Sequence, residues 1–209
     1  MHQYSPPIKE HFLKPRNVGN LDVDCFRGRA GSMTCGAVVQ ISLRIDNTQR
    51  IIDAKFKAAG CSLLVASASF LTEEIKGALT GEVAALAQEP GNIISQALGR
   101  IPADKSHCTA LVCEALLSAI RSYSDSVRDE WNGDEALICT CFCVSETTIE
   151  RAIEAGGLRT IAEVTKACNA GAGCRSCYSL IEDILSDHQR SSSYEGALKL
   201  SLETSEKRN

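Results

Sequence analysis

The sequence predicts an α+β fold, in which a small antiparallel sheet packs with helices and is followed by a small all-helical domain. Apolar residues alternate as in strands in two segments, 37–45 and 51–58, whereas helical spacing predominates elsewhere. A polar and acidic stretch at 122–135 interrupts this pattern and indicates a linker. The chain has 209 residues, which is enough for one large domain or two small ones, and the linker favours two.

The two strand-like segments are expected to form an antiparallel hairpin. Their sequences are AVVQISLRI and IIDAKFKA, and Asp46 with Asn47 supplies the turn between them. Side chains alternate between the two faces of a strand, so every second residue is expected to point inward. These inward residues are Val39, Ile41, Leu43 and Ile45 in the first strand and Ile52, Ala54 and Phe56 in the second.

Three helices complete the expected first domain. Ser5 followed by Pro6 predicts a helix start, and Pro15 predicts the end of that helix. The segment 62–77, SLLVASASFLTEEIKG, is rich in small residues, and its closing glycine predicts a helix end. The segment 107–123 carries its apolar residues on one side, which predicts a second long helix.

The second domain is expected to contain three short helices. Ser145 can cap the first of them, which ends at Gly156–Gly157. Thr160 with Glu163 forms a capping box for the second. The third starts near Cys174, and its apolar stripe comprises Leu180, Ile181, Ile184 and Leu185.

The expected boundaries leave the second domain with little core of its own. The first domain is expected at 1–124, the linker at 125–136, the second domain at 137–187 and a flexible tail at 188–209. A domain of about fifty residues buries little apolar surface, so a bound metal is expected to stabilise it.

Composition indicates a globular protein and argues against several classes of function. Hydrophobic residues make up 44% of the chain and charged residues 23%, with a net charge of -4, which provides no basic surface for nucleic acid. No apolar run reaches the ~18 residues of a membrane span, and the start of the chain lacks the apolar core of a signal peptide. We therefore expect a cytoplasmic protein, in which the eleven cysteines favour metal binding or catalysis over disulfides.

Four cysteines of the second domain form two close pairs. Cys139 and Cys141 make a C-x-C pair, and after thirty-two intervening residues Cys174 and Cys177 make a C-x-x-C pair. Four thiolates in two pairs suit a tetrahedral zinc ion or a [2Fe–2S] cluster, in which each iron takes two sulfurs. Zinc ribbons usually have two C-x-x-C pairs, so the C-x-C spacing favours the cluster. A redox-active pair or ordinary core cysteines are the alternatives.

Two glycines and the surrounding motif support the cluster. Gly171 and Gly173 allow the backbone to approach cluster sulfurs closely. The segments CTCFCVSETTIERAI, GLRTIAEVT and AGAGCRSC resemble the bacterioferritin-associated-ferredoxin type of [2Fe–2S] domain found in the middle of NifU proteins. This resemblance spans 137–187 and implies a permanent [2Fe–2S] cluster on Cys139, Cys141, Cys174 and Cys177. Cys143 and Cys168 are supernumerary and are expected to be structural.

Three cysteines of the first domain occur beside predicted elements. Cys35 precedes the first strand, Cys61 lies between the second strand and a helix, and Cys108 lies near the start of the long helix. A helix N-terminus lowers the pKa of a nearby thiol and so favours the thiolate. From spacing alone, unrelated buried thiols would be an equally good interpretation.

Several motifs of the first domain resemble the iron–sulfur scaffold fold shared by IscU and the N-terminal domain of NifU. They are YSPPIKEHFLKPRNVGNLD, GSMTCGAVV, DAKFKAAGCSLLVASASFLTEEIKG and HCTALVCEALLSAI, within residues 4–124. The resemblance implies a labile [2Fe–2S] or [4Fe–4S] cluster, whose ligands and sulfur acceptors are Cys35, Cys61 and Cys108. It also implies that His107 is an alternate ligand, whereas Cys25 and Cys113 match no family ligand.

The same resemblance implies a function, that of a carrier rather than an enzyme. Sulfur from a cysteine desulfurase arrives as a persulfide, with Cys108 as the first candidate acceptor. Iron joins it, and the finished cluster passes to apo iron–sulfur client proteins. The permanent cluster is the expected local source of electrons, itself supplied by an electron donor. Nucleic acid and membrane are not expected partners, and a homodimer is compatible with the sequence.

Two other functions remain open at this stage. In one, the protein is a redox or electron-transfer [2Fe–2S] protein, or a sensor of iron or clusters, whose first domain stores a cluster rather than delivering it. In the other, the second domain is a zinc-stabilised interaction module.

The chain departs from the family pattern in three respects. The family has Asp two residues after its first cysteine, where this chain has Ala37. The C-terminal C-x-x-C domain of longer NifU proteins is not expected here. The segment IPADKS, just before His107, resembles the chaperone-binding motif of IscU only in part.

Overall fold

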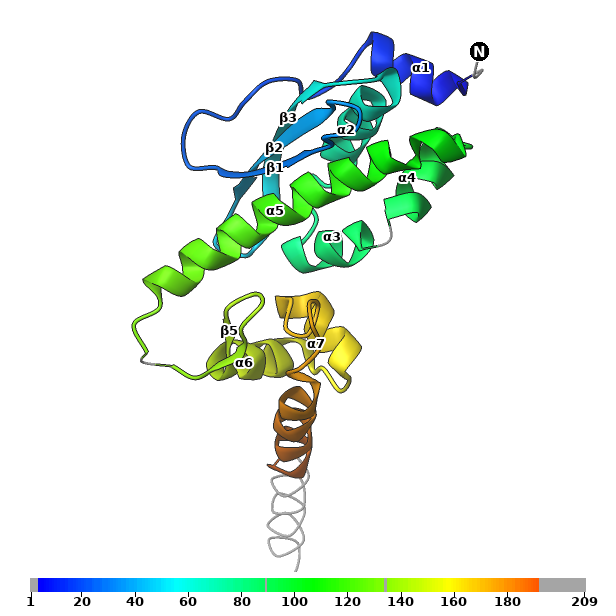
Figure 1. Ribbon diagram of the computed structural model, residues 1–209. Helices are drawn as coiled ribbons and strands as arrows, with labels where there is room; N and C mark the ends of the chain where they lie inside the picture. Colours follow the sequence, from blue (N-terminus) through cyan, green and yellow to red (C-terminus); the bar gives the residue numbers. More distant parts are fainter. Residues whose placement is uncertain (1–3, 89, 134, 192–209) are drawn as a thin grey trace, which may run out of the picture. The chain divides into compact units, whose positions relative to one another are not determined.

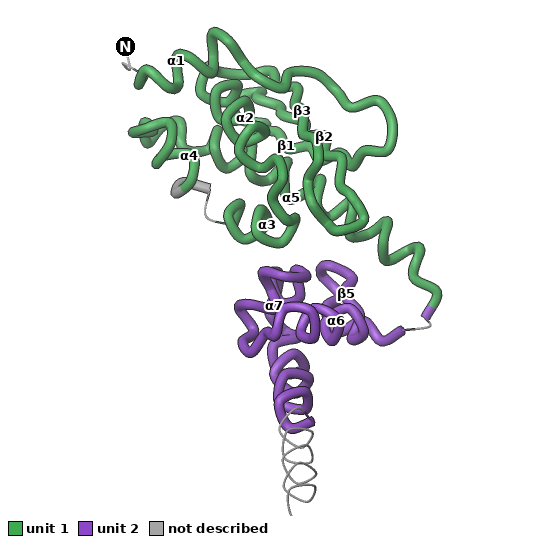
Figure 2. Tube along the Cα trace, turned by 180° about the vertical axis from the view of Figure 1, so that it is seen from behind, with its two compact units in different colours: residues 1–132 green, residues 133–209 purple. Residues whose placement is uncertain are grey.

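The computed structural model describes residues 4–88, 90–133 and 135–191. The chain divides into two compact units, Met1–Asn132 and Gly133–Asn209 (Figure 2). In the part of the chain that is described, no helix combines the length and the apolar character that crossing a membrane requires.

The first unit is built on a three-stranded antiparallel sheet in the order β1-β2-β3 (Figure 1). Its strands are β1 Phe26–Gly31, β2 Val38–Ile45 and β3 Ile51–Ala59. β2 and β3 form the expected hairpin, and the carboxylate of Asp46 in the turn accepts hydrogen bonds from two backbone N–H groups, at 2.8 and 3.0 Å. The sequence did not predict β1, because its charged and glycine residues show no apolar alternation.

The start of β3 differs from the expected pattern of inward residues. Ile51 is fully buried and Ile52 is 53% exposed, so the prediction that Ile52 faces the core is wrong. The last two residues of β2 pair with Ile51 and Asp53 and skip Ile52. Such a bulge shifts the alternation of side chains by one residue. Beyond the bulge, Ala54 and Phe56 are buried as expected.

Two helices cover one face of the sheet. Helix α5, Ser106–Glu130, packs along β1 and β2, and helix α2, Ser62–Glu74, packs against β3 and α5. Gly28 of β1 permits the close approach of α5, because a Cβ at this position would lie 2.1 Å from the carbonyl oxygen of Ala115. The inward residues of β2 that are fully buried are Val39, Ile41 and Leu43, whereas Ile45 is half-buried beside the bulge.

The remaining helices of the first unit surround α2 and α5. Helix α1, Pro6–Leu13, starts at Ser5 as expected, and the Ser5 hydroxyl accepts a hydrogen bond from the Ile8 N–H at 3.4 Å. Helices α3, Thr80–Ala87, and α4, Pro90–Leu98, connect α2 to α5 and were not predicted.

The linker expected at 125–136 is shorter than predicted. Helix α5 continues to Glu130, so residues 125–130 are helical. Tyr123 is 9% exposed and its ring packs edge-on against that of Phe26, with centroids 5.1 Å apart. This contact stabilises α5 at the start of the acidic stretch, and residues 124–130 contain no glycine or proline that would break the helix.

The second unit is helical, as expected, with a short β-hairpin added at its start. Strand β4, Leu137–Cys139, pairs antiparallel with β5, Val144–Ser145. Helix α6, Glu146–Gly156, helix α7, Ile161–Cys168, and a helix at 178–191 follow.

The first two helices of the second unit begin at the predicted caps. The Ser145 hydroxyl accepts a hydrogen bond from the Thr148 N–H at 3.3 Å. The Thr160 hydroxyl accepts from the Glu163 N–H at 3.3 Å, and the Glu163 carboxylate accepts from the Thr160 N–H at 3.0 Å. Helix α6 ends at Gly156 and is capped by Gly157, whose φ of 60° is left-handed.

The third helix begins at residue 178 rather than near Cys174, because the cysteine pair occupies a turn before it. Ile181 and Leu185 are buried as predicted, but Leu180 is 47% exposed. Of the expected flexible tail, residues 188–191 continue this helix, and the rest lies outside the described residues.

Candidate metal-cluster sites

The register of the sheet brings two cysteine-bearing segments to one edge. Val38, the first residue of β2, pairs with Gly31 at the end of β1 and with Ala59 at the end of β3. The loop that carries Cys35 and the junction that carries Cys61 therefore leave the sheet side by side.

Three thiols and one imidazole meet at this edge, which we call the sheet-edge site. Cys61 is the N-cap residue of α2 and Cys108 lies in the first turn of α5. Their Sγ atoms are 3.2 Å apart. Nε2 of His107 lies 3.5 Å from Sγ of Cys108 and 3.6 Å from Sγ of Cys35. The fold thus brings together all four residues that the resemblance named as ligands of a labile cluster.

Cys35 is the exposed thiol of the sheet-edge site. The hydroxyl of Ser32 and the backbone N–H of Ala37 hydrogen-bond its sulfur and lower the pKa of the Cys35 thiol to about 7, with a smaller contribution from His107. Sequence reasoning missed Ser32; the available signal was a hydroxyl residue three positions before Cys35 in a tight turn. That turn is closed by the Gly36 N–H, which donates to the Ser32 carbonyl at 2.8 Å.

Cys108 is the buried thiol of the site. It is 1% exposed, and burial, together with the neighbouring Cys61 and Cys35 sulfurs, raises the pKa of the Cys108 thiol to about 12. Cys61 is half-buried, so the three thiols form a graded series from the surface to the interior.

Two other cysteines of the first unit lie apart from the sheet-edge site. The Cys25 thiol donates to the Leu21 carbonyl at 3.2 Å. Cys113 is 1% exposed inside the packing of α5, and burial raises the pKa of its thiol to about 11.

The four predicted ligands of the second unit also converge. Sγ of Cys141 lies 3.4 Å from Sγ of Cys174, and the Cys139 and Cys177 side chains are hydrogen-bonded to each other. Cys139 and Cys177 are buried, Cys141 is half-buried and Cys174 is exposed. We call these residues the four-thiol site; it has one pair in the interior and one near the surface.

A serine inside the C-x-x-C motif sets the charge at the exposed end of the four-thiol site. The Ser176 hydroxyl lies 3.0 Å from Sγ of Cys174, and together with its backbone N–H it lowers the pKa of the Cys174 thiol to about 7. At the other end, burial and the nearby Cys139 raise the pKa of the Cys177 thiol to about 11. Sequence reasoning missed Ser176, although its place between the two cysteines was visible.

Two glycines fit a bound cluster. A Cβ at Gly173 would lie 2.9 Å from Cβ of Cys141 and 3.0 Å from its sulfur, and one at Gly171 would lie 2.6 Å from the Tyr178 ring. Gly171 also has a φ of +83°, which favours glycine. A side chain at position 173 would therefore crowd the Cys141 sulfur, whereas one at position 171 would clash with Tyr178.

The thiols approach one another in pairs. Across residues 4–88, 90–133 and 135–191, no three His, Cys, Asp or Glu side chains are arranged to hold one metal ion. Two sulfurs on one tetrahedral metal at ~2.3 Å lie about 3.8 Å apart, close to the 3.2 and 3.4 Å of the two thiol pairs. The Sγ–Sγ distance of each close thiol pair is therefore near that of two sulfurs that share one metal.

The supernumerary thiols of the second unit donate to backbone carbonyls. Cys143 has a left-handed φ of 51°, and its thiol lies 3.9 Å from the Thr140 carbonyl oxygen. The Cys168 thiol donates to the Val164 carbonyl at 3.3 Å, and burial raises its pKa. The structural role expected of both cysteines stays a prediction.

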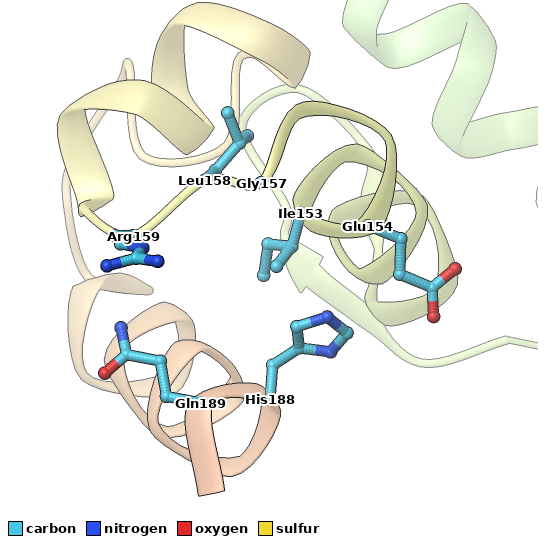
Figure 3. A pocket seen from close by; sticks show the side chains of 7 residues that line it. All are labelled: Ile153, Glu154, Gly157, Leu158, Arg159, His188 and Gln189. Atoms are coloured by element: carbon cyan, nitrogen blue, oxygen red, sulfur yellow. The ribbon is translucent and has the colours of Figure 1, made fainter. Parts of the chain in front are cut away.

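A hollow of about 360 Å³ in the second unit is separate from the four-thiol site (Figure 3). It lies between the end of α6 and the helix at 178–191, and Ile153, Arg159 and His188 are among its lining residues. None of the predicted site residues lines it.

The fold places a group of thiols in each unit, the sheet-edge site and the four-thiol site. Residues 3–129 match the family described as the NifU-like N terminal domain, and residues 137–187 match the BFD-like [2Fe-2S] binding domain. The chain belongs to the NifU-like family and is an iron–sulfur cluster protein.

Some known relatives match most of the chain, and others match its first unit alone. The nitrogen fixation protein NifU of Azotobacter chroococcum mcd 1 is 35% identical over 188 residues, which cover 90% of this chain and 60% of that protein. The iron-sulfur cluster assembly scaffold protein IscU of Haemophilus influenzae is 37% identical over 123 residues, covering 57% of this chain and 94% of that protein. A solved NifU-like N-terminal protein from Brucella abortus aligns with a TM-score of 0.49 at 18% identity, covering 58% of this chain and 94% of that chain.

Proposed function

We propose that this chain is an iron–sulfur cluster assembly scaffold that builds a labile cluster at the sheet-edge site. The observation that carries the proposal is the convergence of three thiols from separate segments. Cys35 and Cys108 both contact the His107 ring, and Cys61 contacts Cys108. One thiol is exposed, one is half-buried and one is buried. This arrangement suits a site that receives sulfur and iron at the surface and holds the cluster in the interior. The relatives named for cluster assembly support the same function.

Cys35 replaces Cys108 as the first candidate acceptor of persulfide sulfur. A thiolate must reach the outer sulfur of a partner's persulfide, and the 1% exposed Cys108 offers no such access. Cys35 is exposed on the loop between β1 and β2, and its neighbours favour the thiolate. The sulfur donor in this proposal is a cysteine desulfurase, and apo iron–sulfur proteins receive the finished [2Fe–2S] or [4Fe–4S] cluster.

The four-thiol site is proposed to hold a permanent [2Fe–2S] cluster on Cys139, Cys141, Cys174 and Cys177. The cluster, when bound, supplies one-electron redox chemistry, and the chain's own contribution is to hold it between a buried and an exposed cysteine pair. The protein acts as a carrier rather than an enzyme, because neither site needs a bond-making acid or base. Its eleven free cysteines suit a reducing compartment such as the cytoplasm.

One observation favours storage of a cluster over its delivery. Ala37, where the family has Asp, is 3% exposed and its N–H donates to the Cys35 sulfur. Its side chain has no group that could compete for iron, so a cluster bound beside it would be released slowly. Transfer of the labile cluster to an apo-ferredoxin distinguishes a delivering scaffold from a storage protein.

The test begins with anaerobically purified protein, whose absorption spectrum and iron, zinc and sulfide contents identify the permanent cluster. Adding a desulfurase, cysteine and ferrous iron should then increase iron and sulfide above that level. The increase should vanish in Cys35→Ala, Cys61→Ala and Cys108→Ala.

The matched controls are Cys25→Ala and Cys113→Ala, which remove thiols of the first unit outside the sheet-edge site. Both should load like the wild type. Equal loss from all five variants, or a colourless zinc-loaded wild type, would contradict the proposal.

A further inference from the structure

Two thiols of the sheet-edge site are paired more closely than the third. The Sγ atoms of Cys61 and Cys108 are 3.2 Å apart, whereas Cys35 contacts the pair through the His107 ring. A disulfide bond is about 2.05 Å long, so the two sulfurs need to approach by roughly 1 Å to form one. The positions of Cys61 and Cys108, each at the start of a helix, place both thiols on rigid elements.

Cluster assembly requires a reductant, because persulfide sulfur is formally at oxidation state zero and cluster sulfide at minus two. We propose that Cys61 and Cys108 form a dithiol that reduces persulfide sulfur to sulfide within the first unit. This inference rests on the scaffold function proposed above and adds a redox activity to the same site.

The burial of the two thiols sets the order of the chemistry. Cys61 is half-buried and can be reached, so it takes the outer sulfur from a protein persulfide or from Cys35, and the donor leaves as a thiolate. Cys108 is 1% exposed, so a sulfur donor cannot reach it, but its sulfur already faces that of Cys61. Cys61 is therefore the persulfide carrier and Cys108 the attacking thiol.

The reducing step balances in atoms and electrons. The Cys108 thiol gives its proton to the anionic outer sulfur as its own sulfur attacks Sγ of the Cys61 persulfide, and the bond between that Sγ and the outer sulfur breaks. A Cys61–Cys108 disulfide forms, and the outer sulfur leaves as HS⁻ with the bonding electron pair and the proton of the Cys108 thiol. Two thiols lose two electrons and one sulfur atom gains them. A dithiol protein of the thioredoxin class then returns the disulfide to two thiols.

The test uses the full-length protein with its permanent cluster oxidised, so that this cluster has no electron to give. Glutathione persulfide is added anaerobically without iron; released sulfide is measured, and alkylated cysteine peptides are identified by mass spectrometry. We expect one HS⁻ for each Cys61–Cys108 disulfide. Cys108→Ser should keep the persulfide on Cys61 and lower sulfide release at least tenfold, to the level of the Cys61→Ser, Cys108→Ser double variant.

The control is Cys113→Ser, which removes a buried thiol from the same helix and should release as much sulfide as the wild type. Three results would overturn the inference. Sulfide could be released while Cys61 and Cys108 both remain thiols, the disulfide could include Cys35, or Cys113→Ser could lose as much sulfide release as Cys108→Ser. If the persulfide accumulates unreduced yet yields a cluster once ferrous iron and dithiothreitol are added, the inference fails while the scaffold function stands. If no cluster forms even then, the scaffold function fails as well.

Discussion

The reactivity of the sheet-edge site depends on the hydrogen bonds around Cys35. Its sulfur receives hydrogen bonds from the Ser32 hydroxyl and the Ala37 N–H, which stabilise the thiolate over the thiol. The folded protein therefore keeps a large fraction of Cys35 as a nucleophile at neutral pH, while Cys108, on the buried side, stays protonated.

This difference predicts the pH dependence of alkylation. The pKa of Cys35 is lowered from 9.0 to about 7, so its reaction with iodoacetamide should rise through a midpoint near pH 7 and then level off. Ser32→Ala removes a donor to the thiolate, which should raise the midpoint and slow the reaction at pH 7 several-fold. Peptide mass spectrometry after timed quenching measures both rates. An unchanged midpoint in Ser32→Ala would show that this hydroxyl does not control the thiolate.

Ala37 occupies a tightly packed position beside the site. Ala37 is 3% exposed. A Cβ built on Gly60, the residue before Cys61, would lie 3.2 Å from the Cβ of Ala37. A carboxylate introduced here would add a competing oxygen ligand and bring water to the iron.

We therefore predict that Ala37→Asp transfers its labile cluster to an apo-ferredoxin faster than the wild type does. The same variant should lower the melting temperature of the apo first unit, because a buried carboxylate is costly. Ala37→Asn is the matched control, because the asparagine side chain has the same size as that of aspartate but carries no charge. If Ala37→Asp transfers no faster, or Ala37→Asn transfers equally fast, the carboxylate does not control release.

At the scale of elements, the site depends on the contact between β1 and α5. That contact holds the N-terminus of α5, with Cys108, against the sheet edge where Cys35 and Cys61 emerge. Its closest point is Gly28, where a Cβ would lie 2.1 Å from the Ala115 carbonyl oxygen and 2.2 Å from the Ala119 nitrogen.

Gly28→Ala should accordingly force α5 away from the sheet. Overpacking of this kind costs typically 1–3 kcal/mol, which corresponds to a fall of several degrees in the melting temperature. Calorimetry of the full chain measures it, and labile-cluster loading should fall with it. Gly31→Ala on the same strand is the control, because its nearest backbone contact would be 3.3 Å and the neighbour can move by a few tenths of an ångström. Equal losses in the two variants would contradict the role given to Gly28.

At the scale of the whole molecule, the two units have separate cores and different sources of stability. The first unit buries a sheet under α2 and α5. The second has a small core around Ile149, Ile153, Val164 and Ile181. The cluster that we propose for the four-thiol site would add the stability of metal binding to this core.

Loss of the permanent cluster should therefore unfold the second unit alone. We predict that Cys174→Ala in the full chain removes the colour of the [2Fe–2S] cluster and the thermal transition of the second unit. The transition of the first unit should stay within a degree or two of its wild-type temperature. Calorimetry with iron and sulfide analysis tests this, and Cys143→Ala, which removes a thiol outside the four-thiol site, should keep both colour and transitions. Loss of both transitions in Cys174→Ala would show that the units fold as one.

Local chemistry explains what the sequence by itself determined. The caps at Ser5, Ser145 and Thr160 were predictable because a cap depends on residues within one helical turn. The candidate ligands could be selected because the C-x-C and C-x-x-C spacings and the family motifs are contiguous in the chain. The sequence also predicted the hairpin of β2 and β3, whose short turn keeps its pairing local.

The tertiary structure alone decided the features that depend on contacts between residues distant in the chain. Strand β1 is stabilised by pairing with β2 and packing under α5 rather than by its own alternation. The bulge that exposes Ile52 and the extension of α5 past Tyr123 likewise follow from pairing and burial. Burial also distinguishes the thiols, with Cys35 at the surface and Cys108 inside, because solvent access depends on every segment packed around a residue.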